Sequence, residues 1–381
     1  MALIRFIPWI LLIADTKGWS LKPIVSMNRW RTPSMAMERC ALTLIDSSTN
    51  TLSDVKSWLV CGDGDLSFST SLAHRLEMFP NVSLTATVLE NQASHEAIYT
   101  NSRRHVEEIS RHPFSHVRFE IDATKLELHF QQQKFDRILF NFPHWRGKSN
   151  HRRNRELLDA FFQSAGRILS VHGEIHIALT HEQGGFNAQS QKEWKESWMP
   201  AMYAAQHGLL VDAVDDFTLT YTLSSHRGVD RPFPIGKQPK LYRFRFPNRF
   251  PVDRTLQLCC RHELHFTLPE VNQSKTDWNV ETILYNDTIQ KFITDNIVPK
   301  GIEIEVPRKE LRDLPEGISV IVVLIVYRGA CLPLTRSMIN NYRARLEEQI
   351  STKVNLRETR MGRLVSKPFP STILPCILLA S

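Results

Sequence analysis

The sequence has few cysteines, and they are scattered along the chain. The six cysteines of the 381 residues are Cys40, Cys61, Cys259, Cys260, Cys331 and Cys376. They form no CxxC pair and no zinc-finger spacing, so we expect neither a disulfide framework nor a zinc site. Scattered cysteines of this kind are typical of buried thiols in a reducing compartment.

Long hydrophobic runs are also missing. The apolar stretch within MALIRFIPWILLIADTKGW is only about nine residues long, which is too short to span a membrane. No small-residue cleavage site of the secretory type follows it, and the cysteine pattern argues against secretion. A mitochondrial presequence and a non-native upstream extension both stay open. Residues 1–51 are therefore predicted to be a basic and apolar extension outside the folded domains.

Neither hydrophobic nor charged residues depart from ordinary proportions. Hydrophobic residues make up 42% of the chain and charged residues 23%, which is typical of a globular protein and argues against disorder. The formal net charge of +7 weakly favours an acidic partner such as nucleic acid. The length allows one large domain and one smaller domain.

Short apolar runs alternate with helical patterns from residue 52 onwards. The strand candidates are 57–61, 82–90, 117–122, 136–142 and 173–180. Helical patterns between them, the clearest at 154–170, predict an α/β fold with a doubly wound parallel sheet. Two more strands, 209–217 and 240–248, follow without a helix between them and predict an antiparallel hairpin at one edge. Seven strands with this hairpin are typical of the class I, Rossmann-like methyltransferase sheet. A helical pattern at 191–208 is expected to break at Pro200.

The pattern changes from about residue 262. We expect a strand at 264–270, a helix at 277–297, a strand at 317–329 and a helix at 334–352 with Thr335 as its N-cap. A strand, helix, strand, strand, helix, strand order predicts a smaller ferredoxin-like α+β domain over 260–358. Residues 359–381 lack periodicity and are expected to form an irregular tail.

The stretch VCGDGDLSFSTSLAH is a candidate ligand-binding turn after the first strand. Gly62 and Gly64 allow close backbone approach to a ligand, but a dinucleotide fingerprint would need a third glycine where Ser67 stands. Asp63 and Asp65 would repel a pyrophosphate, and no GK[ST] follows to make a P-loop. The two acids suit the positive charges of S-adenosylmethionine better than NAD. The alternative is a plain strand-to-helix turn.

Two further acids stand at strand ends. Glu90 ends the second strand, where a carboxylate can accept hydrogen bonds from ribose hydroxyls. Asp122 ends the third strand, where it could contact the adenine amine. Carboxyl ends of parallel strands share one edge of the sheet, so both acids support a cofactor site, although each alone could be a solvated acid.

The stretch NFPH at the end of the fourth strand is a candidate acceptor site. Asn141 can direct its amide to a base edge, Phe142 or Trp145 can stack on the base, and the backbone at Pro143 can present a carbonyl. His144 can accept a proton near neutral pH, or it could be an ordinary loop histidine. The basic residues beyond it are candidates to contact RNA phosphates, or they form a solvated loop: Arg146, Lys148, Arg152, Arg153 and Arg155.

Other histidines do not form a metal site. His172, His176 and His181 lack metal-ligand spacing on one face, and no metal is expected. Cys259 and Cys260 are adjacent and are expected in the core. No G-x-S-x-G elbow anchors a Ser-His-Asp triad.

Four stretches, in this order, resemble the family typified by the yeast 25S ribosomal RNA (uridine-N3)-methyltransferase. They are LVCGDGDLSFSTSLA, FDRILFNFPHWRGK, NRELLDAFFQSAGRIL and GEIHIAL, within residues 57–248. The resemblance implies a class I methyltransferase over 52–250 that uses S-adenosylmethionine to methylate a uridine in large-subunit ribosomal RNA. The set of cofactor candidates is Cys61, Gly62, Asp63, Gly64, Asp65, Ser67, Glu90 and Asp122, and the catalytic candidates are Asn141, Pro143 and His144. The second strand ends in TVLEN where the family has an Asp, so the ribose contact rests on Glu90.

Three more stretches resemble a subgroup with a C-terminal ferredoxin-fold anticodon-binding domain. They are HEQGGFNAQSQKEWKESW, IGKQPKLYRFRF and LIVYRGACLPLTRSMINNYRARLEEQI. The resemblance implies an RNA partner, ribosomal or transfer, and a place in the cytoplasm or nucleolus, with mitochondrial targeting by the N-terminal segment left open. A catalytically inactive RNA-binding or tRNA-binding protein of the translation machinery is the alternative function.

Overall fold

The structure is a computed structural model. It describes residues 56–148, 150–224, 237–248, 252–267, 280–314, 319–353 and 355–362, together with Phe233, Ile235 and Val365. The predicted extension over 1–51 and nearly all of the predicted tail over 359–381 lie outside these residues. The tail prediction is wrong at its start, because residues 359–361 pair with another strand of the second sheet.

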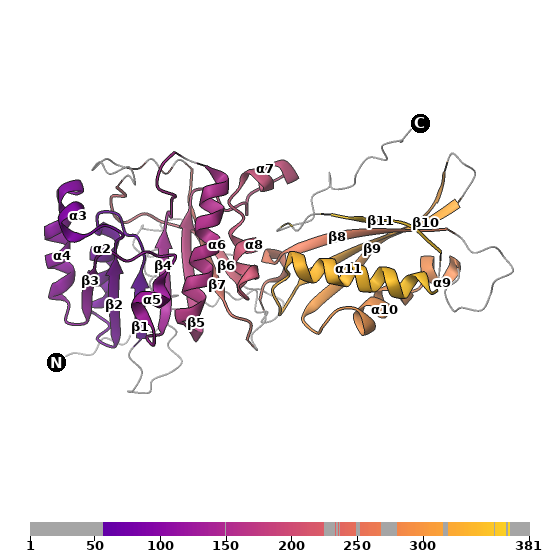
Figure 1. The fold of residues 1–381 in the computed structure, drawn as a ribbon, viewed down its shortest axis with the longest axis horizontal. Helices are drawn as coiled ribbons and strands as arrows, with labels where there is room; N and C mark the ends of the chain where they lie inside the picture. Colours follow the sequence, from indigo (N-terminus) through magenta and orange to yellow (C-terminus); the bar gives the residue numbers. More distant parts are fainter. Residues whose placement is uncertain are drawn as a thin grey trace, which may run out of the picture. The chain divides into compact units, whose positions relative to one another are not determined.

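Seven strands of the described chain form one mixed sheet (Figure 1). They are β1 (Lys56–Val60), β2 (Val82–Thr87), β3 (Ser115–Arg118), β4 (Phe135–Asn141), β5 (Leu169–Leu179), β6 (Leu210–Asp216) and β7 (Lys240–Arg245). The order is β3-β2-β1-β4-β5-β7-β6. The first five strands pair in parallel, and β7 runs antiparallel between β5 and β6. The predicted class I methyltransferase sheet with its antiparallel hairpin is confirmed.

Three strands of this sheet end well before their predicted ends. β2 ends at Thr87 instead of residue 90, so Glu90 lies in the loop beyond it, and β7 ends at Arg245 instead of residue 248. β3 ends at Arg118 instead of reaching residue 122, because Glu120 takes a positive φ of 59° that interrupts the extended backbone. Asp122 therefore lies in the loop beyond the strand.

The helices of this part alternate with its strands. They are α2 (Ser67–Leu76), α3 (Gln92–Ile98), α4 (Ser102–Arg111), α5 (Leu126–Phe130), α6 (His151–Ile168), α7 (Gln191–Glu196) and α8 (Pro200–Gln206). Figure 1 shows α5 and α6 against one face of the sheet. Phe161 and Phe162 of α6 contact Phe140 and Phe244 of that face, at ring separations of 4.8 and 4.9 Å. The predicted break at Pro200 is confirmed, since this proline starts α8.

The start of α6 corrects the interpretation of the basic stretch. Asn150 is the N-cap, and its side chain accepts a hydrogen bond from the Arg153 backbone N–H. The helix therefore begins at His151, so that Arg152, Arg153 and Arg155 lie on its first turns and not in a loop.

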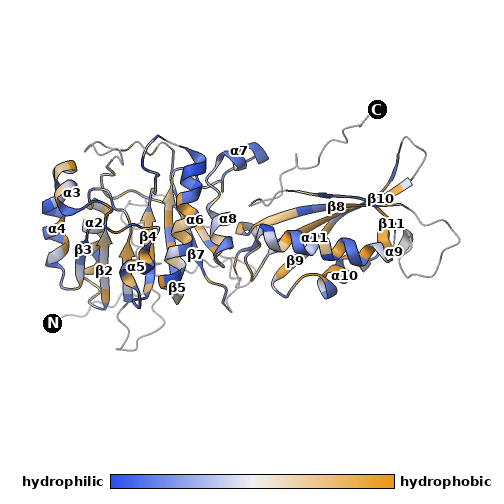
Figure 2. Ribbon diagram, viewed as in Figure 1, coloured by the Kyte–Doolittle hydropathy of each residue, from blue (hydrophilic) through white to orange (hydrophobic). Residues whose placement is uncertain are grey.

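A second sheet follows, as predicted. Its strands are β8 (Cys259–Thr267), β9 (Ile302–Asp313), β10 (Ser319–Gly329) and β11 (Asn355–Met361) in the order β11-β8-β10-β9, and a short 3₁₀ helix, η1 (Arg254–Leu256), precedes β8. With two helical segments as crossovers, this is the antiparallel ferredoxin-like arrangement. β10 is almost entirely hydrophobic, whereas β9 and β11 carry many charged residues. In Figure 2 the helices show hydrophilic residues on one side.

The helices of this second part differ from prediction in one place. α11 (Arg336–Ser351) begins after Thr335, whose side chain accepts a hydrogen bond from the Met338 backbone N–H, so the predicted N-cap is confirmed. The single helix expected at 277–297 is instead two, α9 (Val280–Tyr285) and α10 (Thr288–Asn296). Asn286 and Asp287 lie between them, and such side chains favour turns and caps over helix interiors.

Within the described ranges, no group of three or more His, Cys, Asp or Glu side chains is placed to hold a metal ion. The helices in those ranges are all too short or too polar to cross a membrane.

Candidate cofactor and acceptor site

The turn after β1 has a backbone that requires glycine. Gly62 and Gly64 have φ angles of +58° and +25°, which side chains rarely adopt. A Cβ on Gly62 would also stand 3.0 Å from the Phe140 ring. The predicted glycine turn is therefore a close-approach position at the carboxyl edge of the sheet, where open α/β sheets bind their ligands.

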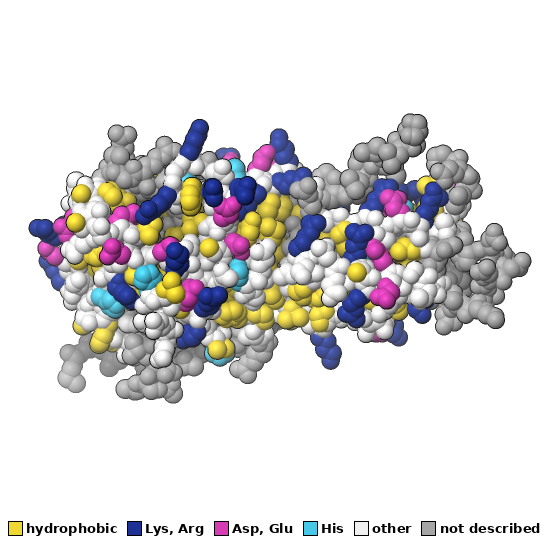
Figure 3. Space-filling model, in the orientation of Figure 1, with side chains coloured by type: hydrophobic (Ala, Val, Ile, Leu, Met, Phe, Trp, Pro, Cys, Tyr) yellow, Lys and Arg dark blue, Asp and Glu magenta, His cyan; other side chains and the backbone are white. Residues whose placement is uncertain are grey.

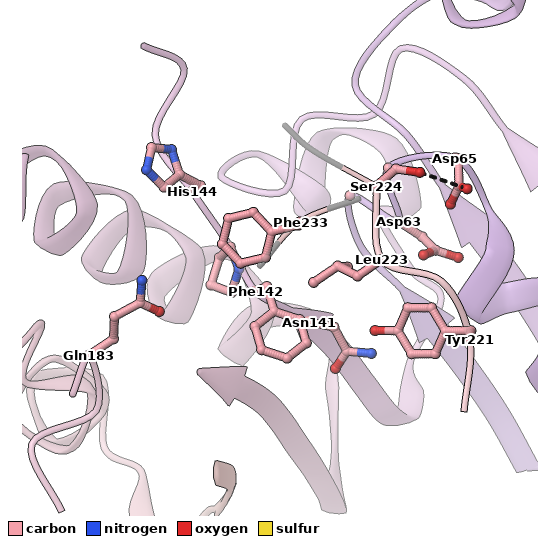
Figure 4. A pocket seen from close by; sticks show the side chains of 13 residues that line it. Asp63, Asp65, Asn141, Phe142, His144, Gln183, Tyr221, Leu223, Ser224 and Phe233 are labelled. Carbon is pink, nitrogen blue, oxygen red and sulfur yellow. Dashed lines mark hydrogen bonds between the residues drawn. The ribbon is translucent and has the colours of Figure 1, made fainter. Parts of the chain in front are cut away.

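Two cavities open beside this turn. The larger cavity has a volume of about 400 Å³ and contains Glu90, Asp122, Tyr99 and Trp145 in its lining. The smaller hollow, of about 60 Å³, is lined by Asp63, Asp65, Asn141, Gln183 and Tyr221 (Figure 4). Both share Gly62, Gly64, Phe142, Pro143 and His144, so the two cavities meet where the glycine turn faces the end of β4.

The larger cavity brings together the two acids predicted from strand ends. Among the described residues, no hydrogen bond to the Glu90 carboxylate is found, so it can accept bonds from a ligand. Asp122 Oδ1 accepts bonds from the backbone and hydroxyl of Thr124, at 2.9 and 2.7 Å. That turn fixes the Asp122 carboxyl at the cavity wall.

The carboxylates of the glycine turn bind the start of α2, which we did not expect. Asp63 Oδ2 accepts a 2.6 Å bond from the Ser69 N–H, and Asp65 Oδ1 a 3.1 Å bond from the Ser67 N–H. Both carboxylates therefore cap the N-terminus of α2, where negative charge is favoured. They line the smaller hollow and not the larger cavity with Glu90. Burial raises the pKa of Asp63 to about 7, although the bonds from Ser69 oppose the shift.

Cys61 and Ser67 line neither cavity. Cys61 is buried in the core, and burial raises the pKa of its thiol. Ser67 Oγ donates instead to the Thr222 carbonyl at 2.9 Å. Cys61 and Ser67 were predicted as cofactor residues because they flank the glycines in the sequence. In the structure both support the turn instead of lining a cavity.

The acceptor candidates gather at the end of β4. Phe142 has a φ of +50°, an uncommon conformation for a bulky residue that turns the chain sharply after Asn141. Its ring packs on Phe217 and Phe233, with centroids 5.5 and 6.5 Å away. The Asn141 amide is buried, and neither its nitrogen nor its oxygen makes a well-aligned hydrogen bond within the described residues. Its one hydrogen-bonding side-chain neighbour among them is the Tyr221 hydroxyl. Figure 4 shows this amide next to the Tyr221 hydroxyl.

His144 lines both cavities. Its Nδ1 donates to the Trp145 carbonyl. Because a carbonyl only accepts, this bond places the proton of a neutral imidazole on Nδ1 and makes Nε2 the acceptor nitrogen. The ring lies edge-on to Trp198 at 6.2 Å.

The basic candidates do not form one group. Arg146 and Lys148 are exposed. Arg152 and Arg153 both pair with Glu156, each at 3.0 Å, and Arg153 lies 5.3 Å from the Trp145 ring centre. Arg155 instead donates to the backbone carbonyls of Lys195 and Ser197. Its guanidinium therefore connects α6 to the C-terminal end of α7 and the residue after it. Figure 3 shows Lys and Arg interspersed with acids on the face in view.

Several site residues were not predicted from the sequence, among them Tyr221, His95 and His105. Tyr221 lines the smaller hollow from the segment after β6. His95 Nε2 donates to the Gly64 carbonyl and His105 Nδ1 to the Asp65 carbonyl, both at 2.6 Å. No motif or periodicity marks these residues, since they reach the turn only through folding of α3, α4 and the β6–β7 connection.

The chain is similar in sequence to one family model and to several known proteins. Residues 59–224 match the model of the family described as BMT5-like, rRNA (uridine-N3-)-methyltransferase. The chain is 35% identical over 229 residues to ferredoxin-fold anticodon-binding domain-containing protein 1 homolog of Mus musculus, covering 57% of this chain and 36% of that protein. It is 32% identical over 228 residues to the Homo sapiens protein of that name, covering 50% and 34%. The chain thus spans about a third of the length of these curated relatives.

Solved structures with a similar sheet include TrmN from Thermus thermophilus, with 15% identity and a TM-score of 0.32 over 51% of this chain and 44% of that one. The glycopeptide N-methyltransferase MtfA complexed with sinefungin gives 11% identity and a TM-score of 0.35, over 56% and 86%. The strand order, and not these scores, identifies the sheet. Residues 59–224 are thus similar to the BMT5-like family over less than half of the chain.

Proposed function

We propose that the chain is an S-adenosylmethionine-dependent RNA methyltransferase that methylates ring nitrogen 3 of a uridine in large-subunit ribosomal RNA. The observation that carries this proposal is the meeting of two cavities at the glycine turn and at Phe142, Pro143 and His144. A donor in the larger cavity and a base at the end of β4 would face each other there. The BMT5-like domain over 59–224 supports the choice of reaction and substrate.

The residues of the larger cavity fit the cofactor. Gly62 leaves room that a Cβ would fill, so a ligand can lie against the backbone. Glu90 can accept bonds from ribose hydroxyls, and Asp122 from the adenine amine. The negative potential of Asp63 and Asp65 near the turn favours a positively charged methyl donor over a dinucleotide phosphate.

The cofactor, when bound, would supply an electrophilic methyl group on a positively charged sulfur, and the sulfur would keep the bonding pair when the methyl group leaves. His144 Nε2 would take the proton of N3, which leaves the N3 electron pair free to accept that methyl group. General-base help of this kind is worth about 10²–10⁴ in rate. Phe142 and Trp145 offer faces on which the base can stack.

RNA would be held outside the pocket by exposed cations and by the second sheet. Arg146 and Lys148 are exposed beside the acceptor site, and Arg152 and Arg153 stand on the first turn of α6. The names of the curated relatives refer to an anticodon-binding domain, which supports an RNA contact by the ferredoxin-like part.

The test uses the full chain with S-adenosylmethionine and a ribosomal RNA transcript. We expect calorimetric binding of the cofactor and mass-mapped 3-methyluridine, with His144→Gln lowering the rate about 100-fold or more. His172→Gln, at an exposed histidine remote from the cavities, is the control. RNA binding without heat from the cofactor would instead establish the inactive RNA-binding alternative.

A further inference from the structure

Tyr221 presents a buried hydroxyl whose only hydrogen-bonding neighbour among the described side chains is the Asn141 amide. The oxygen is inaccessible to solvent, and its contact with Asn141 lacks good hydrogen-bond geometry. Burial, and secondarily the charge of Asp63, raise the pKa of Tyr221, so the hydroxyl keeps its proton at neutral pH and can donate it. An unpaired buried polar group costs about 1–3 kcal/mol. Such an arrangement is expected where a ligand completes the bond.

Asn141 has the same property in the same hollow. Its amide nitrogen and oxygen are both buried, and among the described side chains only the Tyr221 hydroxyl lies near enough to interact with the amide. In Figure 4 the Tyr221 hydroxyl points toward the Asn141 amide. Two hydrogen-bond donors, one from each residue, thus stand together beside Phe142, whose ring forms part of the same lining.

The segment Thr220–Ser224, which we call the β6–β7 strap, is fixed on the glycine turn. Ser224 Oγ donates to Asp65 Oδ2 at 2.8 Å, and Ser67 Oγ donates to the Thr222 carbonyl at 2.9 Å. The Tyr221 ring packs on Phe68, with centroids 5.2 Å apart. Asp65 and Ser67 therefore position Tyr221, a role that accounts for two residues of the predicted cofactor set.

We propose that Tyr221 is a specificity-determining contact, whose hydroxyl acts with the Asn141 amide N–H to bind the two carbonyl oxygens that flank N3 of the target uracil. This inference rests on the proposed function. When N3 loses its proton to His144, the negative charge spreads onto those two oxygens. Two pre-positioned donors then stabilise the anion more than the neutral base, which is the condition for catalysis. Cytosine has an amino group in place of one of these oxygens and lacks the N3 proton, so it is disfavoured.

The experiment compares Tyr221→Phe with the wild-type chain on RNA that carries uridine or cytidine at the target position. We expect the dissociation constant of S-adenosylmethionine to change less than twofold and kcat/KM on uridine RNA to fall about 10- to 100-fold. The rising limb of the pH profile of kcat should move to higher pH, because the bound uracil anion loses a hydrogen-bond donor. Tyr242→Phe, which removes a buried hydroxyl outside both cavities that accepts from the Phe186 N–H, should leave all three readouts unchanged.

Each remaining outcome is decisive. Unchanged kcat/KM in Tyr221→Phe, with wild type methylating uridine, overturns the inference and leaves the proposed function standing. Weakened cofactor binding with the rate retained at saturating cofactor also overturns it and assigns the hollow to the amino-acid end of the cofactor. If Tyr221→Phe does not fold, Ser224→Ala, which only releases the strap, should give the same loss of kcat/KM with cofactor affinity retained. If the wild-type chain does not methylate uridine, the proposed function itself is wrong.

Discussion

At the scale of the residue, Asp63 is the group whose ionisation matters most near neutral pH. Burial raises its pKa to about 7, so its carboxyl is protonated in about half of the molecules at pH 7. A cationic cofactor in the larger cavity, which meets the hollow lined by Asp63 at the glycine turn, favours the carboxylate, so binding below pH 7 must release a proton. We therefore expect the affinity for S-adenosylmethionine to rise about tenfold between pH 6 and pH 8, measured by calorimetry.

The matched variant for this prediction is Asp63→Asn. The Asn oxygen can still accept the bond from the Ser69 N–H, so the cap of α2 is kept. Its affinity should be weaker at pH 8 and should not vary with pH. A variant that keeps the wild-type pH dependence would show that another group titrates.

Sequence reasoning found the residues of the turn but not the directions of their side chains. Gly62 and Gly64 were predictable, because their spacing after an apolar strand is a local signal. Asp65 and Ser67 were assigned to the cofactor, whereas they bind the β6–β7 strap through contacts to residues more than 150 positions away. Contacts of such separation leave no periodicity in the sequence, and Tyr221 was missed for the same reason.

At the scale of the element, α3 and α4 support the glycine turn through hydrogen bonds from two histidines. His95 and His105 donate to the carbonyls of Gly64 and Asp65, and His95 Nδ1 faces the Ser102 hydroxyl at 2.6 Å. Both rings are buried. We expect His95→Ala to weaken cofactor binding about tenfold although it touches no ligand, because the turn loses its support, with a cost in stability of about 1–3 kcal/mol.

His112 at the end of α4 is the control for this prediction. It is also buried and bonds the Ser115 hydroxyl at 2.7 Å, but it does not contact the turn. His112→Ala should lower the melting temperature by a similar amount and leave cofactor affinity unchanged. Equal losses of affinity in both variants would mean that general destabilisation, and not support of the turn, is being measured.

Elements were predictable where apolar periodicity is strong, and their ends were not. The strands of both sheets follow the buried runs, and right-handed crossovers leave few orders for them. The early start of α6 depends on the Asn150 cap, and the end of β3 depends on the positive φ of Glu120. A single side-chain hydrogen bond or backbone angle decides such boundaries, and neither can be inferred from the hydrophobic pattern.

At the scale of the whole molecule, each sheet buries a neutral histidine. His176 in β5 bonds Glu174 at 2.7 Å beside Arg137, and burial lowers the pKa of His176 to about 4. His262 in β8 lies 3.2 Å from the Tyr327 hydroxyl, and burial lowers its pKa to about 4 as well. Both pKa values lie below the ordinary 6.5, so the unfolded chain binds more protons than the folded one at these sites between pH 4 and 6.5. Their contribution to stability is therefore lost as the pH falls through this range.

Asp63 acts in the opposite direction in the same range. Its carboxyl keeps a proton in the fold that it gives up on unfolding, since its ordinary pKa is 3.8. At these three groups, unfolding between pH 4 and 6.5 takes up about two protons and releases about one. Together they should lower the free energy of unfolding by about 1.4 kcal/mol per pH unit on acidification. Asp63→Asn should make this fall steeper by about 1.4 kcal/mol per pH unit, and His176→Gln should make it shallower by a similar amount. Urea unfolding at a series of pH values measures the slope, and a wild-type stability that rises on acidification would show that the two histidines are protonated in the fold.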